Sequence, residues 1–371
     1  MLTQPEVVPY LLHHNLIGTA PIIESDLLVA DVSRRNRNFK VISDRGPSYL
    51  LKQGVGPSGT ATVAHEAAVY EFLRSLGGQH GLEDCLPHYY EYDPEEKILV
   101  MELLRNAQDL HEYHARRGRF STLLARAMGK TLAAIHYVTR TEATNGNNEL
   151  ISAARPPRFL SIHRPAPGIF HDISSANVQL IKTVQRSVPL CQALDELRRG
   201  WRAETLIHYD IKWDNCLVFA RSASNRKSRL KIVDWELACR GDPCWDVGSV
   251  FGNYLSFWLF SIPITGEVPP DRFMELARYP LERMQPAIRS FWQSYVRTME
   301  LDAATSSEWL LCAVKYGAAR LVQAAYEQMQ TSQHLTGSVV YLLQLSLNIL
   351  QRPQEAMVHL LGLPLGQEWA Q

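Results

Sequence analysis

Two short motifs in the second half of the chain carry polar residues that could act together in one chemical site. Residues 208–215 hold Asp210 and, five positions later, Asn215, and residues 232–236 hold Asp234. Metal-assisted phosphoryl transfer needs one carboxylate to orient or deprotonate the attacking hydroxyl. It also needs an amide and a second carboxylate to hold the magnesium that bridges the ATP phosphates. The motifs therefore predict Asp210 as the catalytic base and Asn215 and Asp234 as metal ligands.

The residues between the two motifs favour a single site. Residues 216–219 and 230–233 are apolar and are typical of two short strands, and the polar residues 221–228 are typical of the turn that joins them. Such a hairpin brings Asp234 beside Asn215. One H-x-D motif alone would indicate no more than a loop carboxylate, whereas two motifs in this order, each next to a strand, favour a site.

A family resemblance follows from the second motif and the residues after it. Asp234-Trp235-Glu236 stands where protein kinases carry D-F-G, and residues 241–248 add G-D-P and then Asp246. This pattern resembles the aminoglycoside phosphotransferase/choline kinase-like family. The resemblance implies an α+β, bilobal protein-kinase-like fold with a small antiparallel-sheet N-lobe, a larger helical C-lobe and Mg-ATP in the cleft. It also implies that Asp246 braces the catalytic loop, although on residue grounds Asp246 could instead be a helix N-cap.

In this fold a lysine on the third strand holds the α- and β-phosphates. Residues 27–30, 39–42 and 49–52 are predicted strands, and Lys52 closes the third. A helix beginning near residue 65 carries Glu66 on the same face as its apolar stripe, so Glu66 is the expected partner of Lys52. Glu71 is the weaker choice because it points away from that stripe. The alternative is an exposed lysine and a solvated glutamate.

Two further nucleotide contacts are predicted from position. Residues 33–38 contain no glycine where protein kinases have a glycine-rich flap, but Asn36 stands three residues before Phe39, which resembles the N-x-x-aromatic pattern of the small-molecule kinases. The strand 97–103, which follows a strand at 89–92, leads into the hinge, so backbone groups near Glu102 are expected to meet adenine. These positions predict a nucleotide-binding lobe over residues 1–104 and a catalytic, acceptor-binding helical lobe over residues 105–371.

The helical part should be built on three apolar stripes, at 124–137, 309–326 and 339–350, which are most simply core packing. His136, at the end of the first stripe, is expected to be a core histidine and not a catalytic one. Residues 139–206 form a long insertion containing two Pro- and Arg-bearing segments, 155–159 and 163–167. Such segments can present an extended groove to a peptide or form ordered surface loops.

Composition limits the partners. The 371 residues contain 38 Lys+Arg and 38 Asp+Glu, so no global field favours nucleic acid or an anionic membrane. Residues 1–10 lack the basic region of a signal peptide, and the most apolar stretch, 250–264, is too short and interrupted to span a bilayer. The six cysteines show no C-x-x-C or zinc spacing, so buried thiols and a cytoplasmic location are expected.

Two features of the sequence bear on the identity of the acceptor. Lys212 stands two residues after Asp210, as in Ser/Thr protein kinases, where it meets the transferring phosphate. Residues 33–39, 49–54 and 233–236 also resemble the kinase component of class V lanthipeptide synthetases. That resemblance implies phosphorylation of Ser/Thr in a ribosomal precursor peptide, with a separate lyase as partner.

Two other functions remain open from the sequence. One is a small-molecule kinase for an aminoglycoside or amino alcohol. The other is a pseudokinase that binds a partner without chemistry. The intact set of Lys52, Asp210, Asn215 and Asp234 argues against the pseudokinase, and the missing glycine flap keeps it open. The sequence leaves undetermined the acceptor, the choice between ATP and GTP, and the oligomeric state.

Overall fold

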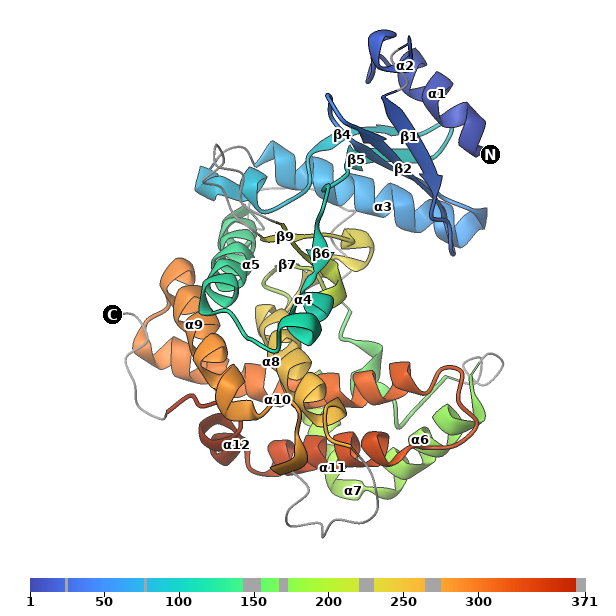
Figure 1. Cartoon of the computed structure of the whole chain (residues 1–371). Helices are drawn as coiled ribbons and strands as arrows, with labels where there is room; N and C mark the ends of the chain where they lie inside the picture. Colours follow the sequence, from blue (N-terminus) through green and yellow to red (C-terminus); the bar gives the residue numbers. More distant parts are fainter. Residues whose placement is uncertain are drawn as a thin grey trace. The chain divides into compact units, whose positions relative to one another are not determined.

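The structure, a computed structural model, describes residues 1–23, 26–76, 79–142, 155–166, 173–219, 230–263 and 275–364 (Figure 1). These residues fall into two compact units that are each discontinuous in sequence. The first contains Met1–Tyr113 and Asp214–Ala238. The second contains His114–Asn147, Ser152–Trp213 and Cys239–Gln371. The chain thus passes from one unit to the other inside the first motif, between Trp213 and Asp214, and the lobe boundary after residue 104 stays a prediction.

The first unit is built on a five-stranded antiparallel sheet in the order β1-β2-β3-β5-β4. Its strands match the predicted positions to within two residues: β2 and β3 alternate buried and more exposed side chains, whereas β5 is a continuous buried apolar run. Phe39, Val41 and Leu51 are buried on one face, where Val7 and Leu11 of the leading helix α1 (Val7–His13) pack against them. The bounds are β1 Leu27–Asp31, β2 Arg37–Ser43, β3 Tyr49–Gln53, β4 Tyr89–Asp93 and β5 Ile98–Glu102.

Helix α3 (Gly56–Ser75) contacts β3, β4 and β5 and runs along the sheet (Figure 1). The predicted start near residue 65 is wrong: the helix begins nine residues earlier. Val55 is extended and Pro57 stands in the first turn, where a missing N–H costs nothing. As a result Glu66 lies in the middle of the helix and not at its start.

A second small sheet in the first unit carries the predicted metal ligands. Strands β6 (Gln108–Asp109), β8 (Cys216–Val218) and β9 (Leu230–Ile232) pair antiparallel in the order β6-β8-β9. Cys216 pairs with Ile232, which confirms the predicted hairpin strands; the predicted turn at 221–228 lies outside the described residues. The single-turn helix η7 (Trp235–Leu237) follows β9 and packs on α3.

The second unit is helical, which confirms the predicted α+β class. Helix α5 (Thr122–Glu142) packs on α9 (Leu281–Met299), and α10 (Ala303–Gln328) packs on α8 (Pro243–Phe260) and α11 (Gly337–Gln351). Helix α5 continues for about another turn beyond the apolar stripe at 124–137. Between α8 and α10, Gly248 lies so close to the opposite helix that a Cβ atom there would come 2.6 Å from the carbonyl oxygen of Ala313.

The described part of the insertion at 139–206 is mostly helix. Phe159 packs edge-to-face on Tyr326 of α10, which favours ordered surface structure for residues 155–163. Among the described residues, no helix combines the length and apolar character needed to cross a bilayer. All six cysteines are free thiols. The remaining elements are η1 Gln4–Glu6, α2 Ala20–Ile23, η2 Gln79–Asp84, α4 Leu110–Arg117, η4 Arg158–Ser161, α6 Ser175–Arg186, α7 Val188–Arg199, β7 Thr205–Ile207, η6 Trp213–Asn215, β10 Cys239–Gly241 and α12 Pro353–His359.

Candidate active site

Lys52 stands at the centre of a charged cluster in the first unit. Its ammonium nitrogen Nζ lies 2.9 Å from both carboxylate oxygens of Glu66 and 2.9 Å from Oδ1 of Asp234. The predicted pairing of Lys52 with Glu66 is therefore present, and Glu71 is exposed on the other side of α3. The neighbouring elements β3 and α3 supply two of the charges, and the turn between β9 and η7, far away in sequence, supplies the third.

The electrostatics of the cluster follow from burial and charge. Burial raises the pKa of the Glu66 carboxyl, and the Lys52 ammonium opposes that rise. Burial would lower the pKa of Lys52, but the carboxylates of Glu66 and Asp234 outweigh it and raise this pKa. With all three groups ionised, one cation faces two anions. The cluster therefore has a net negative charge that a divalent cation can share.

Asp234 has an unusual backbone conformation. Its φ of 70° and ψ of 56° place it in the left-handed region, which costs a non-glycine residue free energy and often marks a functional position. The fully buried Trp235 anchors the turn, because its indole Nε1–H donates to the carbonyl oxygen of Ile232 at 3.2 Å. The turn holds the carboxylate of Asp234, whose side chain is 38% exposed, against Lys52.

Asn215 is buried at the start of β8. The backbone carbonyl oxygen of Asn215 accepts the backbone N–H of Val233 at 3.0 Å, and Val233 directly precedes Asp234. The structure thus brings Asn215 and Asp234 to the same end of the β8–β9 pair. Amide and carboxylate oxygens are the hard ligands that magnesium prefers, so this donor set fits the ion. Their role as metal ligands stays a prediction.

Asn36 and Glu102 do not join this cluster. The Asn36 side-chain oxygen accepts the backbone N–H of Val55 at 3.4 Å. The Glu102 carboxylate binds Lys231 Nζ at 2.7 Å and the N–H of His88 at 3.0 Å, and the Glu102 N–H donates to the His88 carbonyl at 2.8 Å. Both side chains hold elements of the first unit together. Their contacts with nucleotide stay predictions.

In the second unit, two cations lie against the carboxylate of Asp210. Lys212 Nζ lies 2.8 Å from Oδ2, and Arg320 Nη2 lies 3.6 Å from Oδ1. Burial raises the pKa of Asp210, but Arg320 and then Lys212 outweigh it, so this pKa is lowered. Asp210 therefore stays ionised at neutral pH, which suits a group that orients a hydroxyl and accepts its proton as the new bond forms.

Arg320 was not predicted from the sequence. It lies on α10, is only 7% exposed, and places its guanidinium over the ring of Trp245 at 5.7 Å. Its Nη1 is buried without a hydrogen-bond partner among the described residues. A charged residue within the buried stripe at 309–326 was the available signal, since an arginine in a core needs a reason to be there.

Asp246 braces the loop that carries Asp210. Its fully buried carboxylate accepts the backbone N–H of His208 at 2.7 Å and that of Tyr209 at 3.0 Å. The alternative reading of Asp246 as a helix N-cap is wrong, because Asp242 caps α8 through the N–H of Cys244 at 3.0 Å. His136 is buried between Tyr295 and Asp246 and supports this brace as a core residue.

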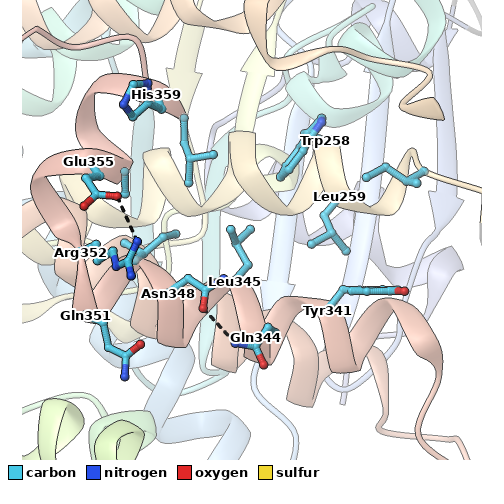
Figure 2. Close-up of a pocket in the computed structure, with 14 residues that line it drawn as sticks. Trp258, Leu259, Tyr341, Gln344, Leu345, Asn348, Gln351, Arg352, Glu355 and His359 are labelled. Carbon is cyan, nitrogen blue, oxygen red and sulfur yellow. Dashed lines mark hydrogen bonds and ion pairs between the residues drawn. The ribbon is translucent and has the colours of Figure 1, made fainter. Parts of the chain in front are cut away.

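Two other features of the described residues are not part of these groups. Asp109, His111 and Asp214 bring three potential metal ligands within 4.8 Å of one another, but Asp109 already caps α4 through the N–H of Glu112. A pocket of about 600 Å³ lies between α8, α11 and α12 (Figure 2). Its apolar lining includes Trp258 and Leu259 of α8 and Leu345 of α11, and α11 and α12 also contribute polar side chains. No predicted site residue lines it.

The chain is similar to known proteins in its sequence profile and in its fold. The sequence profile of the APH phosphotransferase enzyme family matches residues 29–273. Among solved structures, the amicoumacin kinase hAmiN in complex with AMP-PNP, Ca²⁺ and Ami is 14% identical, with a TM-score of 0.53, over 92% of this chain and 96% of that chain. The choline kinase LicA from Streptococcus pneumoniae is 14% identical, with a TM-score of 0.45, over 92% and 99% of the two chains. No curated protein sequence matches.

Proposed function

The chain belongs to the phosphotransferase enzyme family, and from that membership we propose which residues perform the transfer and to what acceptor. The protein is an ATP-dependent kinase that acts on a hydroxyl acceptor and uses a nucleotide and a divalent metal. We assign the metal as Mg²⁺, held by Asn215 and Asp234, and the α/β-phosphate contact to Lys52, fixed by Glu66. Membership in this enzyme family favours a catalytic role over the pseudokinase alternative.

The observation that carries this assignment is the cluster of Lys52, Glu66 and Asp234. A lysine that is only 16% exposed and is held between two carboxylates is fixed in position and kept charged, as a contact to ATP phosphates requires. Magnesium, when bound, neutralises charge on the phosphates. Asp234 can exchange part of its contact with Lys52 for that ion, since the lysine keeps its pairing with Glu66.

In the transfer step we assign Asp210 the role of accepting the proton of the acceptor hydroxyl. The acceptor oxygen forms a bond to the γ-phosphorus, the bond between that phosphorus and the bridging oxygen of ADP breaks, and the hydroxyl proton passes to Asp210. Lys212 and Arg320 hold Asp210 as an anion before the step. Lys212, 35% exposed at its side chain, is placed to balance charge on the transferring group as well.

The favoured acceptor is a Ser or Thr of a ribosomal precursor peptide, whose phosphate a partner lyase then eliminates. The contact of Lys212 with Asp210 supports it, because this lysine position is the one that resembles Ser/Thr protein kinases. The second candidate is a small-molecule acceptor, which the family and the amicoumacin kinase favour.

The test is transfer of label from γ-labelled Mg-ATP to two acceptor pools. One pool holds aminoglycosides and amino alcohols, and the other holds Ser/Thr peptides encoded beside the gene. Label on peptide that disappears in Asp210→Asn supports the favoured function; label on a small molecule alone replaces it with the second candidate. Asp210→Asn should keep Mg-ATP affinity, and full turnover by that variant would remove Asp210 from the step.

A further inference from the structure

Five arginines converge on one pocket in the second unit. The pocket has a volume of about 360 Å³, and its lining includes Arg116, Arg117, Arg119, Arg278, Arg283 and the ring of Tyr279. All five arginines are exposed. They come from the end of α4, the turn after it, the segment before α9 and the first turn of α9. The whole chain has equal numbers of acidic and basic residues, so this is a local concentration of charge.

Helix stability accounts for only two of these charges. Arg116 and Arg117 stand in the last turn of α4, where a cation interacts favourably with the helix dipole. Arg283 stands in the first turn of α9, where the same dipole disfavours a cation. Arg119 and Arg278 lie outside helices. Within the described ranges, no carboxylate forms an ion pair with Arg119, Arg278 or Arg283.

The floor of the pocket is held in place by hydrogen bonds. The Tyr279 hydroxyl donates to the carbonyl oxygen of Ala115 at 2.9 Å, and its backbone N–H donates to Ser261 Oγ at 3.2 Å. Gly118, with a φ of 59°, ends α4 by donating its N–H to the carbonyl oxygen of His114 at 2.8 Å. The arginines therefore project from a fixed frame, and a ligand does not have to order the backbone that carries them.

Aromatic packing joins this floor to the catalytic loop within the same unit. The Tyr279 ring stacks on Phe257 with centroids 4.9 Å apart, and Phe257 contacts Trp213 at 5.1 Å. Trp213 directly follows Lys212, which contacts Asp210. The arginine pocket thus lies two ring contacts from the loop that presents the base, within the unit to which the acceptor step is assigned.

We propose that this arginine pocket binds the carboxylates of an acidic segment of the acceptor peptide. The proposal rests on the proposed peptide acceptor and specifies its charge. Guanidinium groups pair with carboxylates through two parallel hydrogen bonds, and arginines spread over separate segments match several separated carboxylates better than one compact anion. A polycationic acceptor such as an aminoglycoside would be repelled here.

The test measures binding, so that it does not depend on turnover. A fluorescein-labelled octapeptide with four Glu and one Ser is titrated against the full chain by anisotropy, beside an analogue with Gln in place of Glu. The pocket variant is Arg119→Gln/Arg278→Gln/Arg283→Gln. The control is Arg186→Gln/Arg198→Gln/Arg199→Gln, which removes three exposed arginines of α6 and α7 and makes the same change in net charge.

We expect the pocket variant to raise the Kd of the Glu peptide by about tenfold or more and the control to change it by less than about twofold. The Gln analogue should not bind, and rising NaCl should weaken the Glu peptide. Equal losses in both variants, or an unchanged Kd in the pocket variant, would overturn the proposal. The proposal would also be overturned if the arginines bound pyrophosphate but did not bind the Glu peptide.

Mg-ATP affinity, measured on the same samples, separates this proposal from the proposed function. Arginine-dependent binding of the Glu peptide without phosphate transfer to its Ser would keep the pocket and reject that peptide as acceptor. A wild-type chain that binds the peptide but not Mg-ATP would reject the proposed kinase site alone.

Discussion

At the scale of single residues, the pKa of Asp210 depends on two cations, one near to it in sequence and one far from it. Lys212 is two residues away and belongs to the motif. Arg320 is on α10 and is buried. Its charge lowers the pKa of Asp210 more than the charge of Lys212 does. The local motif therefore describes only part of the environment of Asp210, the proposed base.

Replacing Arg320 by Gln should shift the pH profile. Arg320 lowers the pKa of Asp210, so its loss raises that pKa, and the protonated, inactive form then persists to higher pH. The acidic limb of kcat/KM against pH should move to higher pH, and Arg320→Lys, which keeps a cation, should move it less. A lower kcat with an unmoved acidic limb would assign Arg320 a structural role only, and thermal unfolding would show it.

Replacing Lys52 by Met should cost both binding and stability. It leaves the almost fully buried carboxylate of Glu66 without its cation, and breaking a buried pair in this way costs about 3 kcal/mol or more. Mg-ATP titration and urea unfolding measure the two losses. Glu71→Gln, on the exposed side of the same helix, is the matched control and should change neither. Normal Mg-ATP affinity in Lys52→Met would remove Lys52 from the nucleotide site.

The sequence could predict these acidic and basic residues where they stand in short motifs or at strand ends. Asp210, Asn215 and Asp234 are identified by local spacing, and Lys52 and Glu66 by their place on a strand and a helix. Arg320 could not be found in this way, because it is 110 residues from Asp210 in the chain and only the packing of α10 brings it there. The arginine pocket was missed for the same reason.

At the scale of elements, helix α8 holds the loop that carries Asp210. Asp242 caps the helix, and one turn later Asp246 accepts two backbone N–H groups of the loop. Tyr209, with a φ of 72°, stands in a strained conformation that these bonds maintain. The sequence could not tell the cap from the brace, because both residues are Asp and both lie near the start of the helix.

Replacing Asp246 by Asn should therefore lower kcat strongly while leaving Mg-ATP affinity near the wild-type value. An amide has one acceptor oxygen and turns its NH₂ toward a loop N–H, so a buried donor loses its partner at a cost of about 1–3 kcal/mol. Asp242→Asn is the control, since Asn caps helices as well as Asp does. If the two variants lose kcat equally, the brace is not specific to Asp246.

The element boundaries show where local propensity fails. Helix α3 begins at Gly56, although the glycines and β-branched residues at 56–63 disfavour helix, because Val63 and Glu66 are buried beneath the sheet. Helix α5 continues beyond its apolar stripe. In both cases tertiary packing outweighs the intrinsic preference of the residues, and a pattern in sequence does not contain that packing.

At the scale of the whole molecule, the first unit needs residues from two parts of the chain. The segment Asp214–Ala238 supplies β8, β9 and η7, and its Asp234 pairs with Lys52. His65 Nε2 of α3 lies 2.6 Å from the carbonyl oxygen of Ala238 at the far end of the same segment. A cut at the predicted boundary would remove all of these contacts from the first unit.

A fragment of residues 1–113 should consequently be poorly folded, while the same fragment joined through a flexible Gly/Ser linker to residues 214–238 should fold. Amide NMR spectra of the two fragments measure this, with dispersed signals expected only from the second. Well-dispersed spectra from residues 1–113 alone would show that the lobe is complete without the second segment.

The close contact of α8 and α10 has a consequence for motion. Gly248 lets the two backbones approach where a side chain would clash, so the helix that carries Asp246 and the helix that carries Arg320 are packed without a layer of movable side chains at that point. Amide protons there should be among the slowest in the second unit to exchange with deuterium. Asp246 and Arg320, which both contact the loop of Asp210, should therefore keep fixed positions relative to each other.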